Sequence, residues 1–136
     1  MDRRLINEKL EGLRRCIDRI VEKLPTTAAV LAADLDLQDI ITLNLTRAVQ
    51  LCVDIATHLI ADSEASPPES MGEAFTTLVE IRVIEPSLAQ RMRNAVGFRN
   101  IAVHNYQAID WEIVHSICHE NLNDFKDFAR ATAEKL

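Results

Sequence analysis

Hydrophobic residues recur at spacings of three and four along most of the chain, which is the period of amphipathic α-helices. Residues 3–23 show this pattern over about six helical turns and predict an amphipathic helix. The alanine-rich residues 28–33 predict a short helical turn. A long helix is expected next, beginning at an N-cap provided by Asp36 or Asp39 and ending near residue 61. The N-terminal half of the chain is therefore predicted to be helical.

The C-terminal half continues the same period after one clear interruption. Residues 62–70 are polar and contain two consecutive prolines, which predicts a loop, and a short helix is expected over residues 71–83. Pro86 suits the first turn of the next helix, where a missing amide hydrogen costs nothing. Asp110 is a plausible N-cap for a last helix over residues 111–134.

These segments predict an all-α protein, a helical bundle of about five amphipathic helices folded as one domain over residues 1–136. The apolar runs are short and interrupted by charges, so no membrane-spanning helix is expected, and the N-terminus lacks the hydrophobic core of a signal peptide. Cys16, Cys52 and Cys118 are odd in number and lie at apolar positions of the pattern. Buried, reduced thiols in a cytoplasmic protein are therefore expected.

The formal net charge of −6 argues against a protein that coats nucleic acid through a broad basic surface, and no DNA partner is expected. A small cationic cleft is still compatible with it, because the Debye length at physiological ionic strength is only about 8 Å. Arg91, Arg93 and Arg99 cluster just before His104. For Arg91 and Arg93, an ordinary role as exposed helix residues is an equally open interpretation.

The segment 98–109 contains the clearest chemical pattern of the chain. Within it Arg99, His104 and Tyr106 form an R-x4-H-x-Y sequence. An arginine holds a phosphate with a planar, charged fork, and a histidine exchanges protons at physiological pH. This combination suits phosphodiester chemistry, although an exposed arginine, a capping histidine and a half-buried tyrosine would give the same letters.

The helical period constrains how these residues can meet. Arg99 and His104 lie about 140° apart on a straight helix, whereas Asn100 and His104 share one face. Arg99 and His104 come together if the helix loosens near residue 103, or if two copies of the helix meet across a two-fold axis. Gly97 lacks a side chain and is suited to such a close approach of two backbones.

The sequence of residues 98–106, Phe-Arg-Asn-Ile-Ala-Val-His-Asn-Tyr, followed by Ile109 and Asp110, resembles the signature of the HepT-type toxins of the HEPN superfamily. Residues 53–60, Val-Asp-Ile-Ala-Thr-His-Leu-Ile, resemble the upstream helix of these toxins. The resemblance extends over nearly the whole chain in length, helix order and spacing. It implies an all-helical HEPN homodimer that cleaves RNA as a metal-independent endoribonuclease without a cofactor.

The resemblance also implies a cognate partner, an MntA-like nucleotidyltransferase antitoxin that adenylylates the motif tyrosine. Carried over by position, Arg99 and His104 are the catalytic residues and Tyr106 is the residue converted to O-adenylyl-tyrosine. Asn100 matches the polar residue that usually follows the arginine and is assigned a supporting role. The alternative function is a non-catalytic nucleotide-binding or adaptor subunit of a nucleotidyltransferase complex.

The chemistry of RNA cleavage agrees with these roles. Cleavage without a metal needs a base for the 2′-hydroxyl, an acid for the leaving oxygen and a cation for the charged phosphorane, and it produces a 2′,3′-cyclic phosphate and a 5′-hydroxyl. Proton transfer by His104 and charge stabilisation by Arg99 meet these needs in part. One histidine cannot be base and acid at once, which favours a cleft shared by two copies.

Two further clusters have a weaker claim to function. Asp54 and His58 lie four residues apart on the long helix, where Asp54 either supports the motif residues or forms a local pair. His115, Cys118 and His119 suggest a metal site only superficially, because a structural zinc normally needs four ligands. No metal site is predicted.

Overall fold

The computed structural model describes residues 2–136. This part of the chain forms seven α-helices and one turn of 3-10 helix and contains no β-strand. The elements are α1 (Arg3–Lys23), α2 (Ala28–Ala33), α3 (Leu35–Ala61), α4 (Met71–Glu80), α5 (Pro86–His104), η1 (Tyr106–Ala108), α6 (Trp111–Glu120) and α7 (Asn123–Ala133). The predicted all-α class is confirmed, with more helices than expected because the predicted segment 111–134 is divided into two helices and the predicted turn over 28–33 is a helix of its own.

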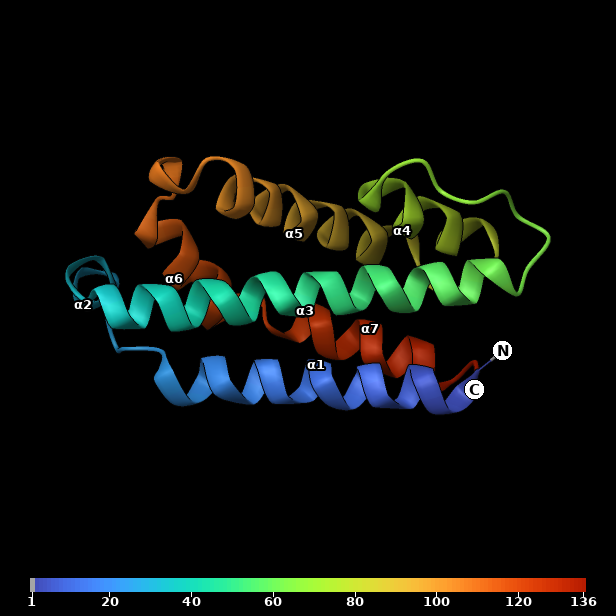
Figure 1. Cartoon of the computed structure of the whole chain (residues 1–136), viewed down its shortest axis with the longest axis horizontal. Coiled ribbons are helices and arrows are strands. Elements are labelled where there is room, and N and C mark those ends of the chain that lie inside the picture. Colours follow the sequence, from blue (N-terminus) through green and yellow to red (C-terminus); the bar gives the residue numbers. More distant parts are fainter. Residues whose placement is uncertain (1) are drawn as a thin grey trace.

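Helix α3 is the central element of the bundle (Figure 1). It contacts α1 along its length and also packs against α2, α4, α5 and α7. Its fully buried side chains include Ile41, Leu45 and Ile55, and burying each such residue contributes about 1.5–3 kcal/mol. By length and composition α3 could cross a membrane, but half of its apolar window is buried inside the bundle. Its apolar character is explained by this position in the core.

The start of α3 corrects one expectation. Neither Asp36 nor Asp39 caps the helix; instead Asp34 is the N-cap, and its side chain accepts a hydrogen bond of 3.1 Å from the amide of Leu37. Asp34 also ends α2, so a single residue joins the two helices without a loop. A capping oxygen accepts from a free amide two or three residues further along the chain, and Asp34 alone of the three aspartates lies directly before the first turn of α3.

Two helices end earlier than expected. The predicted helix over residues 71–83 ends at Glu80, where Arg82 takes a positive φ of 60° and the amide of Val83 donates to the carbonyl of Leu78 at 2.8 Å. This is the hydrogen-bond pattern of a Schellman C-cap. The predicted helix over 111–134 is two helices, because the chain turns after Glu120. The turn lets α6 pack on α2 while α7 packs on α5 and α3.

The predictions for the loop over residues 62–70, for the cap of the last segment and for the cysteines are confirmed. Residues 62–70 contain no regular helix, and Asp110 caps α6, its carboxylate accepting from the amide of Glu112 at 3.0 Å. Cys16, Cys52 and Cys118 are buried free thiols, as predicted. Burial raises the pKa of Cys118 to about 12, so this thiol is protonated and unreactive at neutral pH.

Candidate active site

Helix α5 carries the R-x4-H part of the motif and remains a regular α-helix to its last residue, His104. Pro86 occupies its first turn, as predicted, and Asn105, with φ of −150° and ψ of 60°, ends it. The helix therefore does not loosen near residue 103, which removes one of the two arrangements that would unite Arg99 with His104. Within a single chain the two side chains leave different sides of α5.

Arg99 is half-buried, and its guanidinium donates one long hydrogen bond of 3.3 Å from Nη1 to the side-chain oxygen of Asn100. Its Nε atom is buried and has no hydrogen-bond partner within residues 2–136. An unpaired buried donor costs about 1–3 kcal/mol. Asn100 is thus placed to orient the guanidinium, and Arg99 keeps unused hydrogen-bonding capacity.

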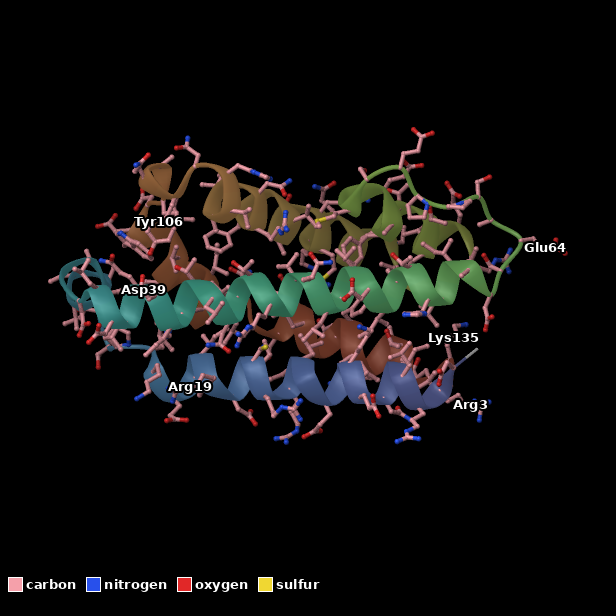
Figure 2. The ribbon with its side chains drawn as sticks, viewed as in Figure 1. Arg3, Arg19, Asp39, Glu64, Tyr106 and Lys135 are labelled. Atoms are coloured by element: carbon pink, nitrogen blue, oxygen red, sulfur yellow. The ribbon has the colours of Figure 1, made fainter. Side chains whose placement is uncertain are left out.

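His104 and Tyr106 lie on either side of the end of α5 and are both exposed. The imidazole of His104 forms no hydrogen bond or ion pair with another of the described residues. Tyr106 begins η1 and donates a hydrogen bond of 3.3 Å from its hydroxyl to Oδ1 of Asp39 on α3 (Figure 2). Its ring also meets the ring of Trp111 edge to face at a centroid distance of 6.0 Å.

The contact with Asp39 was not foreseen from the sequence. Asp39 and Tyr106 are separated by 67 positions, and an aspartate near a helix start is read first as a cap. Partial burial, followed by the negative charge of Asp39, raises the pKa of Tyr106 above the ordinary value for a phenol. Tyr106 is therefore fully protonated at neutral pH in the unmodified chain.

Asp54 lies apart from the motif in the single chain. Its carboxylate accepts hydrogen bonds from Gln50 at 2.9 Å and from Lys9 of α1 at 3.4 Å. The structure of residues 2–136 contains no hydrogen bond or ion pair between Asp54 and His58. The supporting role of Asp54 stays a prediction.

The three arginines of α5 have different environments. Arg91 donates to Asp124 at 2.5 Å and to Asp127 at 3.4 Å, so its charge is neutralised by α7. Arg93 donates to the neutral side chains of Thr76 and Gln90. The open question about Arg91 is thereby answered, because Arg91 holds α5 against α7, whereas Arg93 contacts only neutral side chains of α4 and α5.

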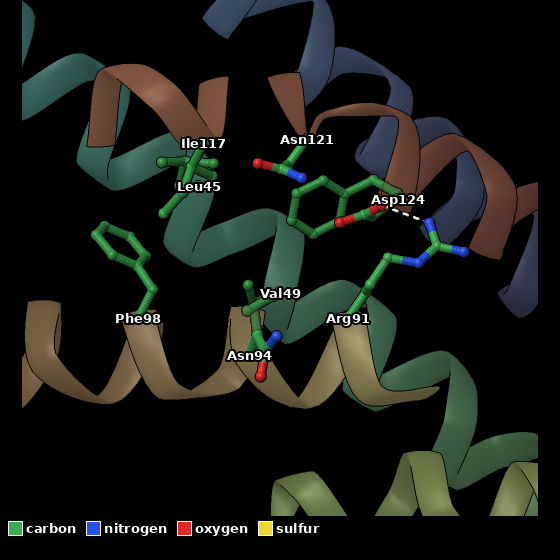
Figure 3. A pocket seen from close by; sticks show the side chains of 10 residues that line it. Leu45, Val49, Arg91, Asn94, Phe98, Ile117, Asn121 and Asp124 are labelled. Atoms are coloured by element: carbon green, nitrogen blue, oxygen red, sulfur yellow. Dashed lines mark hydrogen bonds and ion pairs between the residues drawn. The ribbon is translucent and has the colours of Figure 1, made fainter. Parts of the chain in front are cut away.

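A cleft of about 250 Å³ lies between α5 and the turn that joins α6 to α7 (Figure 3). Phe98 points into it from α5 toward Ile117, and the ion pair of Arg91 with Asp124 borders the far end. Neither Arg99 nor His104 lines this cleft, although Ala95, one of its lining residues, lies one turn before Arg99 on the same side of α5. The cleft and the exposed motif residues are therefore separate features of α5.

The histidines of α6 have structural surroundings. His115 makes a 2.8 Å hydrogen bond with the carbonyl oxygen of Pro25, and its ring stacks on that of the exposed His119. Cys118 faces the core between them. No group of three or more metal-ligating side chains is found within residues 2–136.

The surface beside the motif is apolar. Ile101 and Val103 are each nearly half exposed, and a Cβ atom added at Gly97 would meet nothing within 4 Å, whereas the equally exposed Leu43 lies in the groove between α1 and α3. Gly97, Ile101 and His104 lie at spacings of four and three and share one face of α5. This face has the apolar character that helices bury against a partner.

An all-helical bundle that presents R-x4-H at the end of one helix defines a ribonuclease of the HEPN class. The family described as Ribonuclease HepT-like matches residues 13–132. The chain belongs to this HepT-like family. The predicted family, helical fold and endoribonuclease class are thereby confirmed, and the family does not support the non-catalytic adaptor as the alternative.

Individual relatives agree with the family. The chain is 35% identical to the mRNA nuclease HepT of Shewanella oneidensis over 124 residues, which cover 91% of this chain and 92% of that protein. It is 31% identical to the tRNA nuclease HepT of Aphanizomenon flos-aquae over 74 residues, 54% of this chain and 50% of that protein. A solved structure of the tri-AMPylated Shewanella oneidensis HEPN toxin in complex with MNT antitoxin matches with a TM-score of 0.90 and 33% identity, covering 98% of this chain and 99% of that one.

Proposed function

We propose that the protein is the toxin of a toxin–antitoxin pair, a homodimeric and metal-independent endoribonuclease whose cleft combines Arg99 and His104 of both copies. Its partner is an MntA-like nucleotidyltransferase antitoxin, which neutralises it by adenylylating Tyr106. The family and the modified state of the Shewanella toxin support the two activities. The geometry of α5 supports the composite cleft.

The observation that carries the proposal is the unbroken course of α5 to His104. It keeps Arg99 and His104 on different sides of one helix, so that a second copy is needed to bring an arginine and a histidine to one phosphate. A second copy also supplies the second histidine, and one imidazole then removes the proton of the 2′-hydroxyl while the other protonates the 5′-oxygen. Each transfer contributes a factor of about 10²–10⁴.

The guanidinium of Arg99 fits this arrangement, because Nη1 is the only one of its terminal nitrogens with a hydrogen bond among the described residues, and its buried Nε is not the atom that a phosphate reaches. When a phosphate enters the cleft, the guanidinium can donate two parallel hydrogen bonds to it and stabilise the negative charge that grows on the phosphorane. Asn100 holds the guanidinium through Nη1. The exposed apolar side chains beside Gly97 provide the area that the second copy covers.

The distribution of arginines supports RNA as the substrate of this acidic protein. Arg15, Arg19 and Arg47 line an open groove of about 720 Å³ between α1 and α3. Arg47 is exposed and has no acidic partner among the residues that the structure describes. Arginines in such a groove attract the phosphates of an RNA strand locally, despite the net charge of −6.

The proposed nuclease is tested with the purified protein, RNA and a chelator of divalent cations. Fragments that end in a 2′,3′-cyclic phosphate are expected from the wild type, and none from His104→Ala. His119→Ala, which changes an exposed histidine of α6 outside the motif, is the matched control and should cleave normally. Equal cleavage by His104→Ala, or cleavage that stops with the chelator, contradicts the proposal.

A further inference from the structure

Asp39 and Tyr106 form a contact that joins η1 to the first third of α3 (Figure 2). The phenol is held from two sides, by the carboxylate at 3.3 Å and by the edge-to-face contact with Trp111. Its ring remains 42% exposed, so a large enzyme can still reach it. The hydroxyl that accepts the adenylyl group in the proposed modification is thus already hydrogen-bonded to a carboxylate of the same chain.

The modification itself needs a base. In the transfer, the phenol oxygen attacks the α-phosphorus of ATP, the bond from that phosphorus to pyrophosphate breaks, and the phenolic proton must leave. A phenol has a pKa near 10, and burial together with the charge of Asp39 raises the pKa of Tyr106 further. A protonated phenol is a weak nucleophile, and a positioned carboxylate that takes the proton is the usual solution for hydroxyl groups in phosphoryl transfer.

We propose that Asp39 is the general base for the adenylylation of Tyr106, so that the toxin supplies part of the machinery of its own modification. Oδ1 of Asp39 accepts the phenolic proton as the oxygen–phosphorus bond forms, and pyrophosphate departs as the leaving group. ATP is supplied by the antitoxin. This inference rests on the proposed modification of Tyr106. The present separation of 3.3 Å is long for an O–H···O hydrogen bond and would shorten in the complex, as such contacts often do.

The surroundings of the phenol favour Asp39 over other groups of the chain. Asp110 is engaged in capping α6, and His104 makes no hydrogen bond to Tyr106. Thr42, one turn further along α3, is buried, its hydroxyl oxygen has no hydrogen-bond partner among the described residues, and its proximity lowers the pKa of Tyr106. Asp39 is thus the group of this chain that is placed to take the phenolic proton.

The experiment measures adenylylation of the full-length toxin by purified antitoxin and ATP, with intact-mass analysis over time and peptide mapping of the modified residue. Asp39→Asn keeps the size of the side chain but cannot take a proton at neutral pH. We expect kcat to fall about a hundredfold or more while KM for ATP stays the same, and Asp39→Glu to restore part of the rate. Asp36→Asn, an exposed aspartate on the same turn of α3, is the matched control and should react normally.

The outcomes separate the two proposals. Modification of the wild type at a residue other than Tyr106 overturns the proposed modification and this inference together. Modification of Tyr106 at the wild-type rate in Asp39→Asn overturns this inference alone and assigns the base to the antitoxin. A slow Asp39→Asn that Asp39→Glu does not improve, or whose KM rises instead, makes Asp39 a positioning residue and also overturns the inference. Retained helicity and antitoxin binding of each variant confirm that it is folded.

Discussion

Arg99 and His104 lie on one continuous helix, five residues and about 140° apart around the axis of α5. Arg99 and His104 of a single chain therefore cannot both contact one phosphate. The Nε atom of Arg99 is buried and unpaired within residues 2–136, while His104 is exposed on the face shared with Gly97 and Ile101. Arg99 lies on the opposite side of α5 from this face, so in the proposed dimer the histidine that reaches its phosphate comes from the second copy. The motif spacing therefore supports the proposed dimer.

The first prediction concerns the planar fork of Arg99. Arg99→Lys keeps the charge but loses the paired hydrogen bonds to phosphate, so RNA cleavage should fall about 10²- to 10³-fold with unchanged thermal unfolding. Arg93→Lys is the control, because Arg93 lies on the same helix and contacts only neutral side chains. Cleavage rates under single-turnover conditions give the answer. Full activity of Arg99→Lys would show that charge alone suffices.

The second prediction tests whether the cleft is shared. Arg99→Ala and His104→Ala should each be inactive as homodimers, since each lacks one group in both copies. Mixed dimers regain one arginine and one histidine in the common cleft, and partial cleavage should return. Differently tagged subunits, refolded together and purified by both tags, provide the sample. Inactive mixed dimers would instead indicate a site complete within each copy.

Much of the fold was predictable from the sequence because the apolar period of each helix, the cap at Asp110 and the proline in the first turn of α5 are local signals. The start of α3 was not, because Asp34, Asp36 and Asp39 are all acceptable caps and only the junction with α2 decides among them. The turn between α6 and α7 was also missed. The apolar spacing of residues 111–134 continues through buried Leu122, so the pattern gives no sign that the helix axis changes direction between α6 and α7.

In the candidate site, too, the local motif was predictable from the sequence, whereas the contacts between distant residues were not. Arg99, His104 and Tyr106 are contiguous enough to be recognised as a motif. Asp39 was not found as a site residue, because its contact with Tyr106 depends on how η1 folds back onto α3. The pairing of Arg91 with α7 was likewise invisible, since its acidic partners lie more than thirty positions away. Contacts distant in sequence depend on tertiary packing, which residue types alone do not specify.

The third prediction uses the corrected cap. Asp34→Ala should lower the free energy of unfolding by about 1 kcal/mol, because the amide of Leu37 loses its acceptor at the start of α3. Asp36→Ala, two residues further into the helix, should change it by a few tenths of a kcal/mol at most. Urea denaturation followed by circular dichroism measures both. Equal effects of the two substitutions would contradict Asp34 as the cap.

The fourth prediction locates the second copy. In the single chain Gly97→Ala places a methyl group in open space and should stabilise α5 by about 0.5–1 kcal/mol. If two copies of α5 approach at Gly97, the same methyl group weakens the dimer and reduces RNA cleavage. Gly72→Ala, also in a helix and without close contacts, should leave the dimer unchanged. Sedimentation equilibrium distinguishes the results, and a dimer unaffected by Gly97→Ala would place the interface elsewhere.

The last prediction concerns neutralisation through Tyr106. Tyr106→Phe removes the oxygen that accepts the adenylyl group but keeps the ring and its contact with Trp111, so the variant should fold and cleave RNA. It should remain active in the presence of antitoxin and ATP, whereas the wild type is inhibited. The inhibition has a physical cause, because the attached phosphodiester brings a negative charge two residues from His104 and competes with RNA for Arg99. The phosphoester oxygen of the modified tyrosine carries no hydrogen and cannot donate to Asp39, so the hydrogen bond that links η1 to α3 is lost. Normal neutralisation of Tyr106→Phe by catalytically active antitoxin would show that the modification acts through another residue.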